Sequence, residues 1–429
     1  MRILYLLLTY LLAPVMVLAM LWRGIRDRSY LHGMSQRFGY GAKVQGGAAI
    51  WVHAVSVGEV QAASVLIRDL LVVFSDVPLV LTTVTPTGAA HARRLFGAQI
   101  DVRFVPYDLI GSVRRFFDAV NPRIAVILET ELWPNLYHEC GRRKVPLVLA
   151  SARISPRSIG RYRALASLFR ETLSHGIFIA AQSAADAERF KSIGANAART
   201  HVTGNIKFDI SISNEIKASG HSLRQRYAPE RPVWIAGSSH DGEEQILLDA
   251  QTLLRANGWQ PLLILVPRHP SRFAEVIAWL QKEKIAFITR SSNAEPAADT
   301  EVLLVDTLGE LQAFYGAADV AFVGGSLVPI GGHNLLEPAA LGVPVLTGPH
   351  NFNAADIADQ MIGNGTARVV HDAADVSREV AALLANEDLR RELGERGQAF
   401  IESNRGALAR LLALLVPVIT SAGLPPTSR

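Results

Sequence analysis

The stretch AIWVHAVSVGEVQAASVLIRDLLVVFSDVPLVLTTVT, residues 49–85, decides the fold. It holds two apolar runs, at 49–57 and 77–85, with a helical stretch between them. Short β-rich runs that alternate with helices are typical of βαβ units, and therefore of a parallel sheet wound on both faces. In such sheets ligands bind beyond the carboxyl ends of the strands, so we expect the functional residues in the loops after them.

The alternation continues along the chain and then starts again. RIAVILE, VPLVLASA and GIFIAAQS, within residues 123–183, complete a first series. After VTGNIKFD (202–209), a second series runs through PVWIAGSS, PLLILVPR, VLLVDTL, DVAFVGGS and PVLTG (232–348). A chain of 429 residues exceeds one hydrophobic core. We therefore predict an N-terminal lobe at 48–210 and a C-terminal lobe at 211–429, facing each other across a cleft for a nucleotide-linked donor and a separate acceptor.

Composition limits the partners and the chemistry. The net charge is +4, and the Lys and Arg residues are scattered, which favours acidic small molecules or anionic lipid over nucleic acid. The single cysteine, Cys140, excludes an internal disulfide and a cysteine-based metal site. Neither dinucleotide nor P-loop glycine motifs are present, and no Asp-x-Asp occurs. The acidic groups at 241–244 and 372–375 are interpreted as a helix first turn and a solvated loop rather than as metal sites.

The N-terminus carries an apolar run, Ile3 to Trp22, that is long enough to cross a bilayer. It lacks a signal-peptide cleavage site, so we predict an anchor helix at 1–22 and a basic juxtamembrane segment at 23–47. Two arrangements stay open, a spanning helix and one that lies in the headgroup layer. In either case the lobes face the cytoplasm, because four arginines follow the run: Arg23, Arg26, Arg28 and Arg37.

The C-terminal lobe contains VGGSLVPIGGHNLLEPAALGVPVLTGP, residues 323–349. A buried strand should enter a glycine-bearing loop, with a helix opening near His333. Free N–H groups at that helix start suit a phosphate or carboxylate. Asn334 and Glu337 are three apart and share a helix face, where a carboxylate can accept hydrogen bonds from ribose hydroxyls. Ordinary helix capping is the alternative interpretation.

Two further loops of this lobe, PRHPSRF and DTLGEL, should face the same cleft. Arg268 can meet a phosphate or a cytosine edge with two aligned donors, or can form a surface ion pair. Backbone groups around Leu308, Gly309 and Glu310 can read a base without a side-chain charge.

The N-terminal lobe supplies groups for acid–base chemistry. VSVGEVQAA places Glu59 at a helix start, where it is either a general base toward an acceptor hydroxyl or a stabiliser of the helix. Glu129 ends RIAVILE, and Lys207 lies in GNIKFD. A carboxylate beside an anomeric carbon stabilises oxocarbenium-like charge, and an ammonium offsets charge on a leaving nucleotide. An interlobe ion pair is the alternative for both.

Six motifs, with the N-terminal apolar helix, resemble the Kdo transferases of lipopolysaccharide biosynthesis: HAVSVGEVQAA, TELWPNL, SARIS, GNIKFD, PRHPSRF and GGSLVPIGGHNLLEPAALGVPVLTGP. The resemblance covers nearly the whole chain. It implies an α/β GT-B fold with two Rossmann-like lobes and a central cleft, on the cytoplasmic side of a bacterial inner membrane. It also implies inverting transfer of 3-deoxy-D-manno-octulosonic acid (Kdo) from CMP-Kdo to a lipid A precursor, without a metal or cofactor.

The same resemblance implies roles for particular residues. Glu59 would be the proton acceptor, and Glu129 and Lys207 would stabilise the transition state. The implied CMP-binding set is Pro267, Arg268, Leu308, Gly309, Glu310, Asn334, Leu335, Leu336 and Glu337. Two alternatives stay open: a GT-B enzyme with a UDP-linked donor, which would lack VSVGEV and GNIKFD, and a catalytically silent membrane-tethered nucleotide-binding scaffold, which would not need Glu59.

Overall fold

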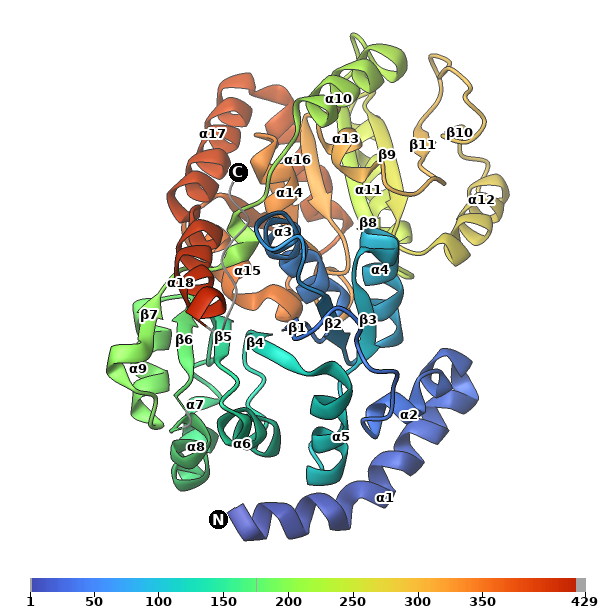
Figure 1. Ribbon diagram of the computed structural model, residues 1–429. Coiled ribbons are helices and arrows are strands. Elements are labelled where there is room, and N and C mark those ends of the chain that lie inside the picture. The colour runs from blue at the N-terminus through green and yellow to red at the C-terminus, as the bar shows by residue number, and fades with distance from the viewer. Residues whose placement is uncertain (1, 175, 422–429) are drawn as a thin grey trace. The chain divides into compact units, whose positions relative to one another are not determined.

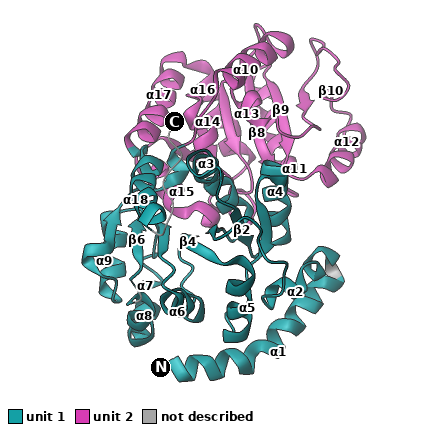
Figure 2. Ribbon diagram, in the orientation of Figure 1, with its two compact units in different colours: residues 1–209, 404–429 teal, residues 210–403 magenta. Residues whose placement is uncertain are grey.

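The computed structural model describes residues 2–174 and 176–421, which form two compact units (Figure 2). Unit 1 comprises Met1–Asp209 with Asn404–Arg429, and unit 2 comprises Ile210–Ser403. Each unit is built on a seven-stranded sheet in which all neighbouring strands are parallel. The two parallel α/β sheets confirm the predicted GT-B class.

The sheet of unit 1 has the order β3-β2-β1-β4-β5-β6-β7. Its central strands are buried on both faces, as their continuous apolar runs predict, because helices cover both sides. The strands are β1 (Ala49–His53), β2 (Leu79–Thr83), β3 (Asp101–Phe104), β4 (Pro122–Leu128), β5 (Leu147–Ala152), β6 (Phe178–Ala181) and β7 (Thr200–Val202).

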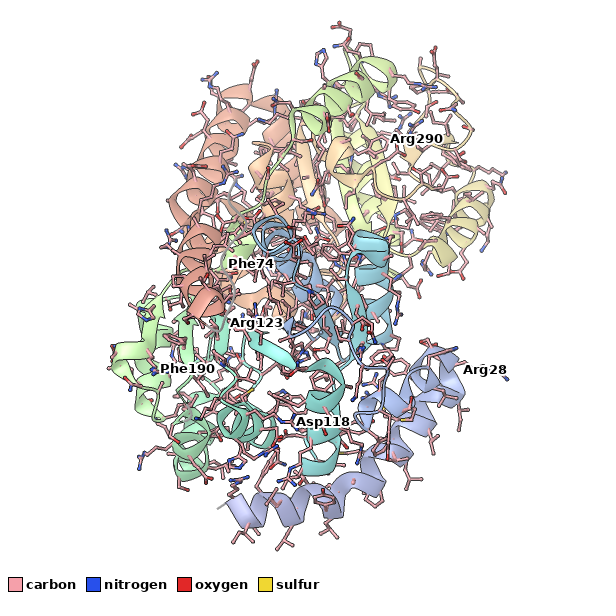
Figure 3. The ribbon with its side chains drawn as sticks, viewed as in Figure 1. Arg28, Phe74, Asp118, Arg123, Phe190 and Arg290 are labelled. Carbon is pink, nitrogen blue, oxygen red and sulfur yellow. The ribbon has the colours of Figure 1, made fainter. Side chains whose placement is uncertain are left out.

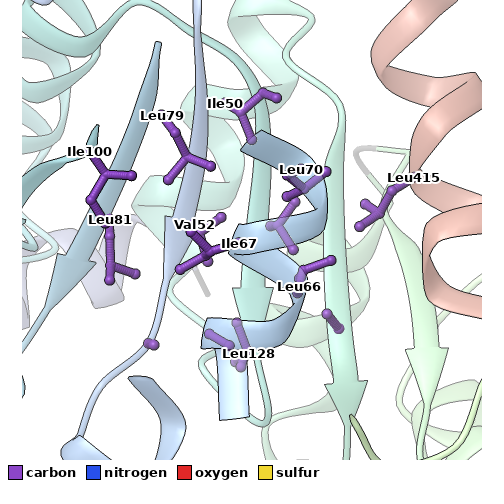
Figure 4. Packing of buried hydrophobic residues seen from close by; sticks show 14 of the residues in the cluster. Ile50, Val52, Leu66, Ile67, Leu70, Leu79, Leu81, Ile100, Leu128 and Leu415 are labelled. Carbon is purple, nitrogen blue, oxygen red and sulfur yellow. The ribbon is translucent and has the colours of Figure 1, made fainter. Parts of the chain in front are cut away.

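Two apolar cores line the faces of this sheet. Figure 4 shows one of them, in which side chains of β1, β2 and β4 meet Leu66, Ile67 and Leu70 of α3. The helices around the sheet are α3 (Val57–Val73), α4 (Pro86–Phe96), α5 (Ile110–Val120), α6 (Pro134–Arg143), α7 (Ile159–Ala164), α8 (Ala166–Leu173) and α9 (Ala184–Ser192).

Unit 2 repeats the design with the order β10-β11-β9-β8-β12-β13-β14. Figure 1 labels its strands β8, β9, β10 and β11. Its strands are β8 (Val233–Ser239), β9 (Leu262–Pro267), β10 (Phe287–Thr289), β11 (Val302–Leu304), β12 (Val320–Val323), β13 (Val345–Thr347) and β14 (Ala367–Val369). Its helices are α10 (Asn214–Tyr227), α11 (Glu243–Ala256), α12 (Phe273–Lys282), α13 (Leu311–Tyr315), α14 (Leu336–Ala340), α15 (Ala355–Gly363), α16 (Ala373–Ala385) and α17 (Glu387–Asn404).

Four strands were absent from the predicted series: β3, β7, β10 and β14. All four are edge strands of three or four residues. An edge strand has a neighbour on one side only and is partly exposed, so it needs no long apolar run. The ten predicted strands are the ones nearer the centre of each sheet.

The predicted second lobe extended to the end of the chain, and this is wrong for helix α18 (Ala407–Ser421), which belongs to unit 1. Leu411, Leu415 and Ile419 recur every fourth residue and are fully buried in the core of unit 1. Leu415 is labelled in Figure 4. The Asp209 carboxylate accepts hydrogen bonds from the backbone N–H groups of Gly406 and Leu408 at 2.7 and 2.6 Å. An apolar helix face therefore decides which unit the C-terminal segment joins.

The predicted juxtamembrane segment also differs from the structure, because from helix α2 (Met34–Arg37) onward it packs on unit 1. Arg37 is buried, donates to the Val84 carbonyl at 2.7 Å and lies over the Phe104 ring. This arginine is a packing residue of unit 1. It is therefore not a charge that flanks a membrane segment.

The N-terminal apolar run forms helix α1 (Arg2–Arg26), as predicted. Among the described residues it is the one helix long and apolar enough to cross a bilayer. Part of its surface contacts unit 1: the Tyr5 hydroxyl donates to Asp108 Oδ2 at 2.7 Å, and Arg2 pairs with Glu171 at 3.6 Å. Most of its leucine side chains are exposed.

Candidate functional site

Glu59 lies in the first turn of α3, directly after strand β1. The Ser56 side chain caps the helix and accepts from the Glu59 N–H, while Glu59 Oε2 accepts from the Val55 N–H at 2.9 Å. Burial raises the pKa of the Glu59 carboxyl to about 7, and the carboxylate of Glu129 adds to the rise. A carboxyl with this pKa exchanges protons readily near neutral pH.

Glu129 and Lys207 meet inside unit 1. The Lys207 ammonium lies 2.6 Å from Glu129 Oε1, so these two form an ion pair within one unit rather than between lobes. Glu129 has a backbone φ of +60°, a strained value for a residue with a side chain, and such strain gathers at functional sites. The Asn205 side chain accepts from the Lys207 N–H and caps the short 3-10 turn Ile206–Phe208 that carries it.

A fourth charged residue of this cluster, Glu131, was not predicted. Its Oε2 accepts from the Trp133 indole N–H at 2.7 Å, and its backbone carbonyl accepts from Tyr137. Burial raises the pKa of Glu131, and its charge contributes to the raised pKa of Glu59. The motif TELWPNL is the available signal, since it places an acid three residues after the end of β4.

Arg268 follows the last residue of β9 in unit 2 and is exposed. Its backbone N–H donates to the Ser239 carbonyl at 3.0 Å. Across the described ranges 2–174 and 176–421, no acidic side chain forms an ion pair with its guanidinium. The alternative of a surface ion pair therefore loses its support. Pro267, beside it, is buried as the end of the strand.

Asn334 and Glu337 contact each other, with Asn334 Nδ2 donating to Glu337 Oε1 at 3.2 Å. Burial raises the pKa of the Glu337 carboxyl, while Asn334, Gln312 and Arg268 act against the rise. The side chains of Leu335 and Leu336 are buried in the core, so only their backbone groups can meet a ligand.

The predicted base-reading residues Leu308, Gly309 and Glu310 lie in the turn before α13. Gly309 has a φ of +88°, and Leu308 is 61% exposed. The Glu310 carboxylate is already engaged, since it pairs with Arg290 at 2.9 Å (Arg290 is labelled in Figure 3) and accepts from Thr307.

The glycine-bearing loop after β12 differs from its prediction. The helix opens at Leu336 rather than near His333, and it has five residues. The N–H groups of Gly331 and Gly332 donate to the Gly325 carbonyl. Those of residues 325–327 all donate to the buried carboxylate of Glu243, at 2.7 to 2.9 Å. The Glu243 carboxylate thus accepts the hydrogen bonds of residues 325–327, in a loop where the sequence suggested that an external anion would bind.

Three histidines lie near Arg268, and none of them is among the predicted binding residues. His240 Nε2 and His333 Nε2 are 2.8 Å apart, and the His240 and His269 rings are 5.3 Å apart in an edge-on arrangement. Each follows a different strand, β8, β9 or β12, at the carboxyl end of the sheet. The signal was present in SSHDGEE, PRHPSRF and GGHN.

Comparison with known proteins agrees with this arrangement. Residues 32–210 match the family described as 3-deoxy-D-manno-octulosonic-acid transferase (kdotransferase), and residues 230–400 match the glycosyl transferases group 1. A 3-deoxy-D-manno-octulosonic acid transferase of Haemophilus influenzae is 40% identical over 92% of this chain and 93% of its own length. The chain belongs to the Kdo transferase family.

Other relatives of this Kdo transferase agree in sequence or in fold. A transferase of the same name from Bordetella pertussis is 39% identical over 86% of this chain and 87% of its own length. The structure of Anabaena Alr3699/HepE in complex with UDP covers 87% of this chain and 100% of its own, with a TM-score of 0.56 and 14% identity. A UDP-GlcNAc 2-epimerase from Neisseria meningitidis gives 0.55 at 12% identity, over 87% of this chain and 100% of its own. Both structures show the shared fold alone.

Proposed function

We propose that this Kdo transferase moves Kdo from CMP-Kdo onto a hydroxyl of a lipid A precursor, by one inverting displacement without a metal. The observation that carries the proposal is the Glu59 carboxyl, with a pKa of about 7, beside the Glu129–Lys207 ion pair. A base whose pKa matches the working pH combines a useful ionised fraction with enough basicity to take a proton.

The displacement balances as follows. Glu59 takes the proton of the acceptor hydroxyl while that oxygen forms a bond to the anomeric carbon of Kdo. The bond from this carbon to the phosphate oxygen breaks, and CMP leaves with the electron pair. Glu129 stabilises the positive charge that develops on the sugar, and Lys207 offsets the negative charge on CMP.

Unit 2 holds the nucleotide in this proposal. Arg268, which has no ion-pair partner among the described residues, is available to the phosphate or the cytosine edge. Glu337 accepts from the ribose hydroxyls, and the backbone of residues 308–310 reads the base. Asn334 orients Glu337 through the hydrogen bond between them.

Helix α1 keeps the enzyme at the cytoplasmic face of the inner membrane, where the lipid acceptor lies. The contacts of Arg2 and Tyr5 with unit 1 favour a helix in the headgroup layer. A spanning helix with Arg23 on the cytoplasmic side would carry Tyr5 across the bilayer, away from Asp108. A cysteine introduced as Leu4→Cys should therefore resist an impermeant maleimide in intact spheroplasts, and labelling there would show a spanning helix.

Turnover of CMP-Kdo with lipid A precursor in detergent, followed by CMP release, tests the function. We expect release by the wild-type chain in the presence of a chelator. Among residues 2–174 and 176–421, no cluster of three or more His, Cys, Asp or Glu side chains could hold a metal. A strict need for a divalent ion, or turnover of a UDP-sugar in place of CMP-Kdo, would contradict the proposal.

A further inference from the structure

Four nitrogen-bearing side chains converge in unit 2 from three loops at the carboxyl end of its sheet. His240 follows β8, Arg268 and His269 follow β9, and His333 follows β12. The rings of His240 and His333 are nearly parallel, with an interplanar angle of 8° and centroids 5.0 Å apart. These loops therefore present a surface rich in N–H donors, with one guanidinium that lacks an acidic partner among the described residues.

The contact between His240 and His333 requires a defined proton. Two imidazole nitrogens 2.8 Å apart form a hydrogen bond only when one carries hydrogen and the other does not. The neutral pair therefore carries two ring protons, one shared between the two Nε2 atoms and one on Nδ1 of the accepting ring. A third proton, on Nδ1 of the donating ring, would make the pair cationic and would need a nearby anion.

The protein holds this pair in place through Glu243. This buried carboxylate accepts from the backbone N–H of His240 at 3.0 Å and from the N–H groups of residues 325–327. The Gly325 carbonyl in turn accepts from Gly331 and Gly332, just before His333. The two rings meet because one carboxylate ties their two loops together.

We propose that the His240–His333 pair, together with Arg268 and His269, binds the phosphate of the CMP moiety, and that the pair takes up a proton as the phosphate binds. The inference rests on the proposed function and adds phosphate-binding residues to it. In the free protein, neutral imidazoles limit the electrostatic repulsion between the pair and the Arg268 guanidinium. In the complex, a protonated pair complements the negative charge of the phosphate.

The electrostatic setting agrees with this assignment. Burial lowers the pKa of His333 to about 3, and Arg268, His240 and His269 lower it further. Burial also lowers the pKa of His240, with His269, Arg268 and Arg272 adding to the effect. The charged groups that act on the two rings are thus cationic, whereas Asp241 and Glu244 are paired with Arg272 and Glu243 is engaged by backbone N–H groups. A bound phosphate would place an anion beside the pair and favour its charged form.

The test is calorimetric titration of the full-length protein in detergent with CMP and, separately, with cytidine. Titrations at pH 7.5 in two buffers of different ionisation enthalpy give the number of protons taken up. The variants are His240→Asn and His333→Asn, with His221→Asn on the exposed side of α10 as the matched control. His240 is only half-buried, so its variant tests the proposal even where the His333 variant weakens the fold.

We expect the wild type and the control to take up protons with CMP but not with cytidine. Each variant should bind CMP about 10- to 100-fold more weakly, the usual worth of a hydrogen bond to a charged group, and should bind cytidine as the wild type does. Unchanged CMP affinity and proton uptake in both variants would overturn the proposal. This holds even if their KM for CMP-Kdo rose, because the pair would then bind the carboxylate of the sugar and not the phosphate. A wild type that binds neither ligand would instead overturn the proposed function.

Discussion

Glu59 in unit 1 and Glu243 in unit 2 occupy corresponding places in the two sheets. Glu59 follows β1 and Glu243 follows β8, and each of these strands lies inside its sheet with a neighbour on both sides. Both carboxylates lie in the first turn of the helix that comes next. Glu59 accepts one backbone hydrogen bond, from Val55, and one from the Ser56 hydroxyl at 3.4 Å. Glu243 accepts four, from His240 and residues 325–327, and has no exposed surface.

The number of backbone N–H donors around each buried carboxylate distinguishes a group that can exchange a proton from one that holds loops in place. With a single backbone donor and Glu129 nearby, burial holds the pKa of Glu59 at about 7, where a proton can come and go. With four donors, Glu243 instead ties two loops together. The same strand-to-helix geometry thus holds the proposed base in one unit and ties two loops together in the other.

The largest effect should come from Glu59→Gln. We expect transfer to fall by about 10²- to 10⁴-fold, because the amide cannot take the acceptor proton. CMP affinity should not change, since Glu59 and the CMP-binding residues belong to different units. Transfer is followed by CMP release and affinity by calorimetry. Near wild-type turnover would remove Glu59 from the role of base.

Glu243→Gln should show the opposite pattern. The amide can accept only part of the four hydrogen bonds and adds a donor among donors, so the free energy of unfolding should fall by about 2 to 3 kcal/mol. Chemical denaturation measures this, with the exposed Glu283→Gln as control. If both variants unfold at the same denaturant concentration, the four hydrogen bonds do not hold unit 2 together.

Glu337 lies between these two cases, because its carboxylate has the side chains of Asn334 and Gln312 as partners and a proposed ligand. Glu337→Ala should weaken CMP binding by ~1 to 3 kcal/mol, since the ribose hydroxyls lose a charged acceptor. Calorimetry with CMP measures the change. An affinity equal to that of the wild type would count against a ribose contact.

The pH profile of the wild type provides a test of Glu59 that needs no substitution. The base form of Glu59 disappears below its pKa of about 7, so kcat/KM should fall about tenfold per pH unit there and level off above it. Steady-state rates from pH 5 to 9 give the profile. A profile that stays flat through pH 7 would show that a group other than Glu59 accepts the proton.

The smallest effect concerns stability. The folded-state pKa of Glu59 lies above the ordinary value of 4.5, so the folded protein binds more protons between pH 4.5 and 7, and stability falls as pH rises through this window. Glu59→Gln removes this loss, so its Tm should exceed that of the wild type at pH 8 but not at pH 4.5. Thermal melts at the two pH values suffice, and a lower Tm of the variant at pH 8 would show that Glu59 stabilises the fold.

The sequence by itself determined the two α/β units, their central strands and the apolar helix α1. Strands buried on both faces require continuous apolar runs, and such runs are visible locally. Its motifs also singled out Glu59, Glu129 and Lys207, which the structure brings together, and Asn334 with Glu337, which are in contact.

Only the tertiary structure decided the rest, because the remaining features depend on residues far apart in the chain. Each edge strand pairs with a single neighbouring strand. Helix α18 joins unit 1 because the apolar side chains that bury its apolar face belong to that unit. The shared proton of His240 and His333 needs two loops 93 residues apart. Glu243 reads as an ordinary acid in a helix first turn until the N–H groups of residues 325–327 surround it, and no local pattern encodes how many donors will meet one carboxylate.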